Sequence, residues 1–207
     1  DNSIFQNFIK ENHGLILDVR TPQEFYSGHL VDATNIDFYA EDFKNRLQLL
    51  RKDIPIYVYC KSGGRSSSAA SIMEDLGFAK VYNLIGGITS WNFHSYFTIQ
   101  SKAQEIKTHH IISLNDLKNF LDANDNVLLA FTTEWCVPCK KMNPIINQIK
   151  DEKSNCEVLF IDADVNSELV KEYKIKGVPA FLFFKKSREF FRHIGVISKE
   201  ELLNQIN

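Results

Sequence analysis

The sequence has few cysteines, no long apolar run and no surplus of charge of either sign. Four cysteines among 207 residues are too few for a scaffold held together by disulfides. No apolar run approaches the ~18 residues of a membrane-spanning helix, so we expect no membrane span. With 24 Lys and Arg against 26 Asp and Glu, the chain lacks the basic surplus that favours nucleic acid or an anionic membrane surface as the main partner.

The composition is that of a folded protein with room for two domains. Hydrophobic residues make up 44% and charged residues 24% of the chain, which excludes a disordered or low-complexity scaffold. At ~100–200 residues per domain, the length allows one large or two small domains. A polar stretch at 98–105 follows an aromatic segment. We therefore predict a first domain at 1–98, a linker at 99–106 and a second domain at 107–207.

Short apolar runs alternate with helical patterns in the first half. Expected strands lie at 15–17, 33–36, 54–59 and 81–84, and expected helices at 22–27, 41–50, 66–76 and 88–94. Such alternation predicts an α/β domain whose parallel sheet carries helices on both faces.

The second half continues this α/β pattern. Expected strands lie at 109–112, 127–132 and 158–161, followed by a hairpin of 180–184 and 189–194. Expected helices lie at 113–121, 136–150, 167–173 and 198–206. Ser113 is expected to cap its helix with Asp116 as partner, and Pro144 should kink the helix that contains it.

A cysteine stands where a parallel sheet places its ligands. Cys60 directly follows the apolar run 56–59 and opens the loop Cys60-Lys61-Ser62-Gly63-Gly64-Arg65-Ser66. The glycines let backbone N–H groups point inward, and the following helix N-terminus adds positive potential. We expect a nucleophilic thiol with a lowered pKa, in a loop suited to a persulfide, a sulfur oxyanion or a phosphate.

Two further motifs occur in order around this loop. They are Asp18-Val19-Arg20 with Glu24-Phe25 and Gly28-His29, and Asn83-Leu84 with Gly86-Gly87-Ile88 and Trp91. With these motifs the first half resembles the rhodanese family of sulfurtransferases.

The resemblance implies that Cys60 accepts a sulfane sulfur from a donor such as thiosulfate or a persulfide, and that a thiol then removes it. Lys61 and Arg65 would orient or attract an anionic donor. The implied substrate-binding loop comprises Lys61, Ser62, Gly63, Gly64, Arg65 and Ser66. Structural or supporting roles are implied for Asp18, Arg20 and His29.

Three other interpretations of this half stay open. Related domains with one more loop residue are phosphatases, but Arg65 is the fifth residue after Cys60, as in the shorter loop. The domain could be purely structural, although silent relatives usually lack the cysteine. A free cysteine is also often only a small apolar side chain of the core. The glycine-rich loop with cations on both sides argues against this interpretation of Cys60.

A second thiol site lies at Trp135-Cys136-Val137-Pro138-Cys139, between an expected strand and an expected helix. The spacing predicts that Cys136 is exposed at the helix N-terminus and that Cys139, one turn further, attacks a mixed disulfide at Cys136. Half of a zinc site looks the same, but no second Cys/His pair has suitable spacing. We expect no metal and no cofactor.

The residues around this pair identify a second resemblance. Trp135, Pro138, Pro144, the segment Gly177-Val178-Pro179-Ala180-Phe181 and Gly195 are similar to their counterparts in thioredoxin. The resemblance implies a thioredoxin fold, with Cys136 as attacking thiol and Cys139 as resolving thiol. It further implies that a cis Pro179 and Val178 shape the substrate groove, with Trp135 beside the site.

The second half also departs from the thioredoxin pattern. Many thioredoxins carry a buried Asp six residues before the first cysteine and a Lys nearby, where this chain has Ala130 and Phe160. We therefore predict slower resolution and a narrower substrate range. The fourth cysteine, Cys156, is interpreted as a half-buried core residue.

The chain is thus predicted to be a fusion of a rhodanese-like sulfurtransferase and a thioredoxin-like oxidoreductase. In the leading hypothesis, Cys60 becomes a persulfide, and the dithiol of Cys136 and Cys139 reduces persulfides or disulfides of protein partners. Alternatively, the first half is a non-catalytic docking module for the redox half. The missing start Met and the departures from the thioredoxin pattern favour a bacterial periplasm or cell envelope, whereas the low cysteine count fits the cytoplasm equally well.

Overall fold

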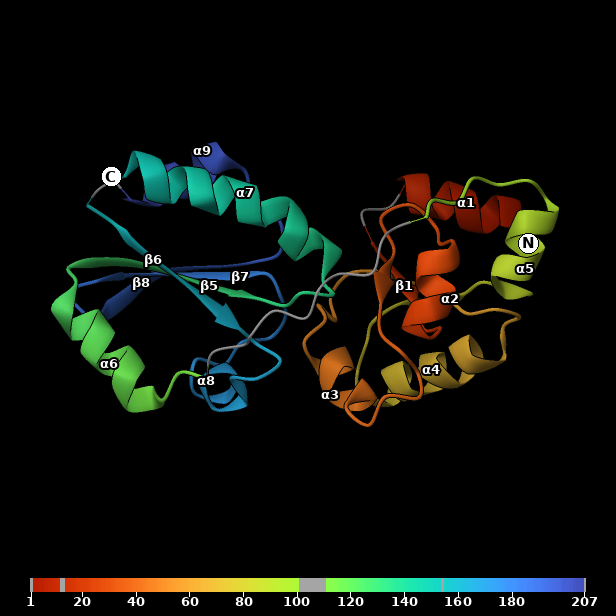
Figure 1. Cartoon of the computed structure of the whole chain (residues 1–207), viewed down its shortest axis with the longest axis horizontal. Helices are drawn as coiled ribbons and strands as arrows, with labels where there is room; N and C mark the ends of the chain where they lie inside the picture. The colour runs from red at the N-terminus through yellow and green to blue at the C-terminus, as the bar shows by residue number, and fades with distance from the viewer. Residues whose placement is uncertain (1, 12–13, 101–110, 154, 207) are drawn as a thin grey trace. The chain divides into compact units, whose positions relative to one another are not determined.

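The computed structural model describes residues 2–11, 14–100, 111–153 and 155–206. The chain divides into two compact units, 1–106 and 107–207, each built around its own sheet (Figure 1). Most of the predicted linker, from residue 101 on, lies outside the described residues, as do residues 109–110 of the strand expected at 109–112. The described end of that expected strand, Ile111 and Ile112, forms no strand. Ile99 pairs with His29 in an antiparallel bridge and so extends the first unit beyond residue 98.

The first unit has a parallel sheet of strand order β2-β1-β3-β4. Its strands are β1 (Leu15–Asp18), β2 (Thr34–Asn35), β3 (Ile56–Tyr59) and β4 (Val81–Asn83). The helices that alternate with these strands are α2 (Pro22–Ser27), α3 (Phe43–Gln48), α4 (Gly64–Asp75) and α5 (Gly87–Phe93). Every residue of β1 and β3 is buried, as expected for central strands covered on both faces. The predicted parallel α/β arrangement is confirmed.

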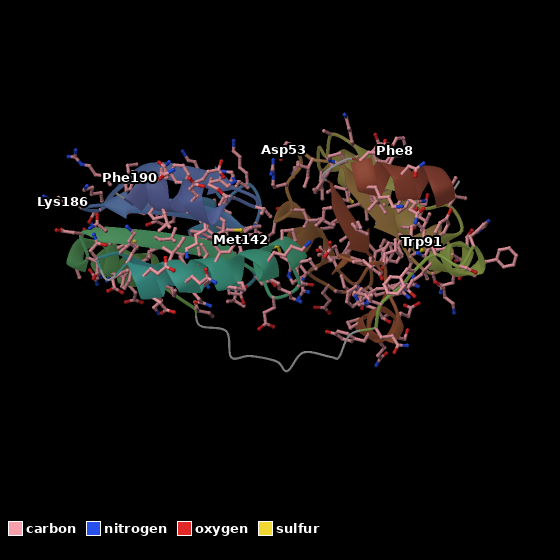
Figure 2. The ribbon with its side chains drawn as sticks, turned by 90° about the horizontal axis from the view of Figure 1, so that it is seen from above. Phe8, Asp53, Trp91, Met142, Lys186 and Phe190 are labelled. Atoms are coloured by element: carbon pink, nitrogen blue, oxygen red, sulfur yellow. A yellow bond between two sulfur atoms is a disulfide. The ribbon has the colours of Figure 1, made fainter. Side chains whose placement is uncertain are left out.

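One helix of this unit, α1 (Asn2–Glu11), was not predicted from the sequence. Its Phe5 packs edge-on against Tyr57 of β3 and Trp91 of α5, so α1 closes the face of the sheet that α5 also covers. Figure 2 labels Phe8 of α1 and Trp91. The signal was present in the spacing of Phe5, Phe8 and Ile9, which places them on one face of a helix.

The second unit has a mixed sheet of strand order β6-β5-β7-β8. Its strands are β5 (Asn126–Thr132), β6 (Glu157–Asp162), β7 (Ala180–Lys185) and β8 (Arg188–Ile194). Its helices are α6 (Leu114–Ala123), α7 (Val137–Glu152), α8 (Ser167–Glu172) and α9 (Lys199–Ile206). The predicted antiparallel hairpin of β7 and β8 is confirmed. Helices α7 and α9 cover one face of the sheet, and α6 and α8 the other (Figure 1).

The core of the second unit lies between α7 and the sheet. Met142, labelled in Figure 2, and Ile146 are fully buried on α7 against Leu128 of β5 and Phe183 of β7. Each such side chain contributes about 1.5–3 kcal/mol through burial. Because this packing fixes α7, it also fixes the helix start at which the paired cysteines stand.

Two helices of this unit begin as predicted at serine caps. Ser113 accepts a hydrogen bond from the backbone N–H of Asp116 at 3.1 Å, and Ser198 accepts one from Glu201 at 3.2 Å. The Asp116 carboxylate accepts from the Ser113 hydroxyl at 2.7 Å. Within the described parts of the chain, every helix is too short or too polar to cross a membrane.

Candidate active sites

Cys60 lies at the carboxyl end of β3, directly before the turn into α4. Gly63 is the N-cap residue of this helix and has φ 104°, a conformation that glycine adopts without strain. This turn directs the backbone N–H of Gly63 to Sγ of Cys60 at 3.1 Å. The Ser66 hydroxyl donates a second hydrogen bond to Sγ at 3.3 Å. The thiol is buried and held by donors, an arrangement suited to a thiolate.

The surroundings shift the pKa of Cys60 in opposite directions. Burial acts to raise the pKa of the thiol, since it removes water from the thiolate. Hydrogen bonds from the Ser66 hydroxyl and from the backbone N–H groups of Ser66, Gly63 and Ser62 act to lower it. The balance leaves the pKa of Cys60 below its ordinary value. A lowered pKa raises the thiolate fraction of Cys60 at a given pH, and the thiolate is the nucleophilic form.

The glycine motif at the start of α5 packs against the backbone of the Cys60 loop. Ile88 donates its backbone N–H to the carbonyl of Cys60 at 2.9 Å, and Thr89 donates to Lys61 at 3.1 Å. Gly87 has φ +57°, and a Cβ on it would collide with the backbone of Cys60 and Lys61. The motif that contributed to the rhodanese resemblance therefore lets two chain segments approach closely.

Arg65 of the loop lies in an ion pair with Glu24 of α2. Its guanidinium donates to both carboxylate oxygens, at 2.7 and 2.8 Å. Its charge also lies over the ring of Tyr39, 5.6 Å from the centroid. Arg65 was predicted to bind the anionic sulfur donor, whereas no role at the site was predicted for Glu24. The side chain of Lys61, in contrast, is exposed and makes no hydrogen bond or ion pair with the residues that the structure describes.

Two charged residues of the first motif, Asp18 and Arg20, pair with each other inside the first unit. Asp18 and Arg20 form a buried ion pair at 2.6 Å. Arg20 also donates to the carbonyl of Gly28 at 2.7 Å and lies over the ring of Tyr59. This network ties β1 to the segment after α2, and so fixes α2 beside the Cys60 loop.

The second thiol site is a disulfide between Cys136 and Cys139 at the start of α7. Sγ of Cys136 accepts the backbone N–H of Cys139 at 3.2 Å and caps the helix. The prediction that Cys136 is exposed was wrong, because the side chain is 2% exposed. The disulfide folds its sulfur back over the first turn of α7, and the carbonyl oxygen of Val178 lies 3.8 Å away.

The segment of Val178 and Pro179 adjoins the disulfide, and Trp135, next to Cys136 in sequence, bonds to a distant residue. The Val178–Pro179 peptide bond is cis, as the thioredoxin resemblance implied, and the Pro179 carbonyl accepts the N–H of Gly195 at 2.8 Å. The indole N–H of Trp135 donates to the carboxylate of Asp164 at 2.6 Å. Sequence analysis gave Asp164 no role, although it follows β6 at the edge of the sheet where the cysteines lie.

The two residues at which the chain departs from the thioredoxin pattern place apolar side chains in the interior of the second unit. Ala130 of β5 is fully buried, and Phe160 of β6 packs against the same cluster as Met142. Cys139 is itself fully buried. Ala130 supplies only a methyl group at the position where the thioredoxin resemblance implies a buried carboxylate.

The remaining cysteine does not join either site. Cys156 is buried in the core of the second unit, as predicted, and burial raises the pKa of its thiol to about 11. Among residues 2–11, 14–100, 111–153 and 155–206, no group of three or more His, Cys, Asp or Glu side chains could hold a metal ion.

Comparison with known proteins identifies both halves. Family profiles match a rhodanese-like domain at residues 2–94 and thioredoxin at residues 109–207. The chain is 32% identical over 93 residues to thioredoxin of Mycoplasmoides gallisepticum, covering 45% of this chain and 93% of the relative. It is 37% identical over 91 residues to thioredoxin of Rickettsia felis, covering 44% and 87%. It is also 40% identical over 76 residues to the uncharacterized protein YqhL of Bacillus subtilis, covering 37% and 59%.

Fold and disulfide together define a thioredoxin-type thiol-disulfide oxidoreductase preceded by a rhodanese-like domain. The chain belongs to the thioredoxin family through its C-terminal half and carries its rhodanese-like domain as an N-terminal fusion.

Proposed function

We propose that the two thiol sites carry out consecutive steps of sulfur transfer and reduction. The Cys60 thiolate attacks the outer sulfur of a sulfane-sulfur donor such as thiosulfate or a persulfide. With thiosulfate, the S–S bond of the donor breaks, sulfite leaves with the bonding electrons, and Cys60 becomes a persulfide. No oxidant or reductant is needed for this step.

The hydrogen bonds to Sγ of Cys60 are the observation that carries the proposal. A buried thiol without donors would have a raised pKa and behave as an apolar side chain. The donors from Gly63 and Ser66 instead lower the pKa of Cys60. The same N–H groups could hold the outer sulfur of a persulfide, which is also an anion.

In the second step the dithiol removes the transferred sulfur. The Cys136 thiolate attacks the outer sulfur of the Cys60 persulfide, which releases Cys60 as a thiolate and leaves a persulfide on Cys136. Cys139 then attacks Sγ of Cys136, so that hydrosulfide leaves and the Cys136–Cys139 disulfide forms. The dithiol supplies the two electrons that reduce sulfane sulfur to sulfide. An external dithiol must reduce the disulfide before another cycle, and the same pair can reduce disulfides of protein partners.

Sulfide release by full-length variants tests this sequence of steps. The reduced protein should release one sulfide per chain from thiosulfate. Cys60→Ser and the double variant Cys136→Ser with Cys139→Ser should each release none. If tethering raises the local thiol concentration, the intact chain should also release sulfide faster than an equimolar mixture of these variants. Equal rates for the intact chain and the mixture would remove the coupling claim.

Cys60→Ala separates this proposal from the alternative of a docking module. A docking module binds its partner through surface contacts, so its support of disulfide reduction should survive loss of the Cys60 thiol. The proposal requires that Cys60→Ala loses sulfide release while it still reduces a protein disulfide such as that of insulin. Sulfide release at the rate of the unaltered protein would contradict the proposal and favour the docking module.

A further inference from the structure

The ion pair between Glu24 and Arg65 places a fixed negative charge beside the Cys60 loop. Glu24 is held from two sides. Its Oε2 accepts the backbone N–H of Thr21 at 3.0 Å, and both of its oxygens accept from Arg65. Arg65 holds the pKa of Glu24 at about 2, so the carboxylate stays charged at physiological pH. The pair is therefore a permanent part of the site.

This pair changes the charge that an incoming donor meets. Arg65 lies close enough to Cys60 for their charges to interact. Its positive charge is offset by Glu24, and the N–H groups that could fork onto an anion are directed to the carboxylate. Of the two cationic side chains of the loop, only that of Lys61 has no ion-pair partner in the described part of the chain. With the Cys60 thiolate counted, the charges of the loop and of Glu24 cancel, so no net positive charge attracts a dianion such as thiosulfate.

We propose that Glu24 is a positioning residue that selects the sulfur donor, by engaging Arg65 so that Cys60 takes sulfur from persulfides of at most one negative charge in preference to thiosulfate. This inference rests on the proposed function and names the donor class for the same site. The Cys60 thiolate attacks the outer sulfur of R–S–SH, the S–S bond of the donor breaks, RS⁻ leaves, and the persulfide forms on Cys60. Atoms and electrons balance without a further reactant.

The replacement Glu24→Gln isolates the charge from the fold. Gln serves as well as Glu at the third position of a helix whose N-cap is Thr, so the start of α2 is kept. The replacement frees Arg65 for an anionic donor. Any change in the pKa of Cys60 affects both donors alike and cancels in the ratio of their rates.

The experiment measures transfer of sulfur to Cys60 in the full-length reduced chain carrying Cys136→Ser and Cys139→Ser. Mass spectrometry measures the second-order rate constants with which thiosulfate and cysteine persulfide load sulfur onto Cys60. In Glu24→Gln the ratio of the thiosulfate rate to the cysteine persulfide rate should rise about tenfold, the scale of one unit charge near a protein surface. The rise should come from tighter apparent binding of thiosulfate. Glu74→Gln, which removes an exposed charge from α4, should leave the ratio unchanged.

A second variant keeps the proposal testable if Glu24→Gln does not fold. Arg65→Gln leaves Glu24 unpaired, so the ratio should fall at least as far below that of the unaltered site. An unchanged ratio in both variants, with Cys60 loaded by both donors, would overturn the role of Glu24 and leave the proposed function standing. Failure of both donors to load Cys60 in every variant would overturn the proposed function itself.

Discussion

The hydroxyl of Ser66 donates a hydrogen bond to Sγ of Cys60 across 3.3 Å, from the first turn of α4. A hydrogen bond to a charged group contributes about 1.5–3 kcal/mol, and one pKa unit corresponds to about 1.4 kcal/mol. Loss of the Ser66 hydroxyl should therefore change the pKa of the Cys60 thiol measurably.

The variant Ser66→Ala should raise the pKa of Cys60 by about one to two units. The thiolate is the reacting form and exists above the pKa, so the pH at which loading of Cys60 is half-maximal should move upward. The pH profile of Cys60 alkylation, followed on its peptide by mass spectrometry, measures the shift. Ser68→Ala, at an exposed position of the same helix, should not move the profile. Equal profiles for both variants would show that Ser66 has no electrostatic role.

Replacement of Gly87 by Ala should destabilise the first unit by about 1–3 kcal/mol, the usual cost of a strained backbone position. The added Cβ meets the backbone of Cys60 and Lys61, which has little room to move. Urea unfolding in a Trp135→Phe background, where Trp91 is the remaining tryptophan, measures the loss.

Gly64→Ala is the matched control for this glycine. A Cβ on Gly64 meets no atom within 4 Å, and the position is helical. Ala should be neutral there or stabilise by about 0.4–1 kcal/mol. Equal stability of the two variants would contradict the close approach of Gly87 to the loop.

Introduction of a carboxylate by Ala130→Asp should speed the resolving step of the second unit. The carboxylate would lie in the apolar interior below the disulfide and could accept the proton of Cys139. The buried group should also cost about 1–3 kcal/mol of stability. Stopped-flow release of a chromophoric thiol from a mixed disulfide at Cys136 measures the rate. Ala130→Asn, which adds similar bulk without a proton acceptor, should not accelerate it, and an unaltered rate in Ala130→Asp would refute the idea.

Alkylation of the reduced, folded protein should distinguish the cysteines by their pKa values. At neutral pH a mild reagent should label Cys60 well before Cys156, since hydrogen bonds lower the pKa of Cys60 and burial raises that of Cys156 to about 11. Peptide mass spectrometry at successive times gives the order. Faster labelling of Cys156 would conflict with the account of both environments.

Local patterns predicted most elements but not the contacts between distant segments. Pro22 at the start of the pattern predicted helix α2, and alternation of strands and helices predicted the parallel sheet. Helix α1 was missed, although Phe5, Phe8 and Ile9 form an apolar face, because the helix is short and precedes the first strong strand. Its stability comes from packing on Tyr57 rather than from its own sequence.

The same holds for the candidate sites, where local motifs were predicted and contacts between distant segments were not. The cysteines and the glycine-rich loop were evident from motifs. Glu24 could not be paired with Arg65, since 41 residues separate them and only the fold brings α2 to the start of α4. The burial of Cys136 was mispredicted because covering by Val178 is likewise a tertiary effect.

The account depends most on the capacity of Cys60 to take up one sulfur atom. Intact-protein mass spectrometry of the reduced Cys136→Ser, Cys139→Ser chain, treated in parallel with thiosulfate and with cysteine persulfide, tests this directly. The account predicts a mass increase of one sulfur per chain, located on the Cys60 peptide and abolished by Cys60→Ser. A chain that gains no sulfur from either donor, or gains it elsewhere than on Cys60, would contradict the account.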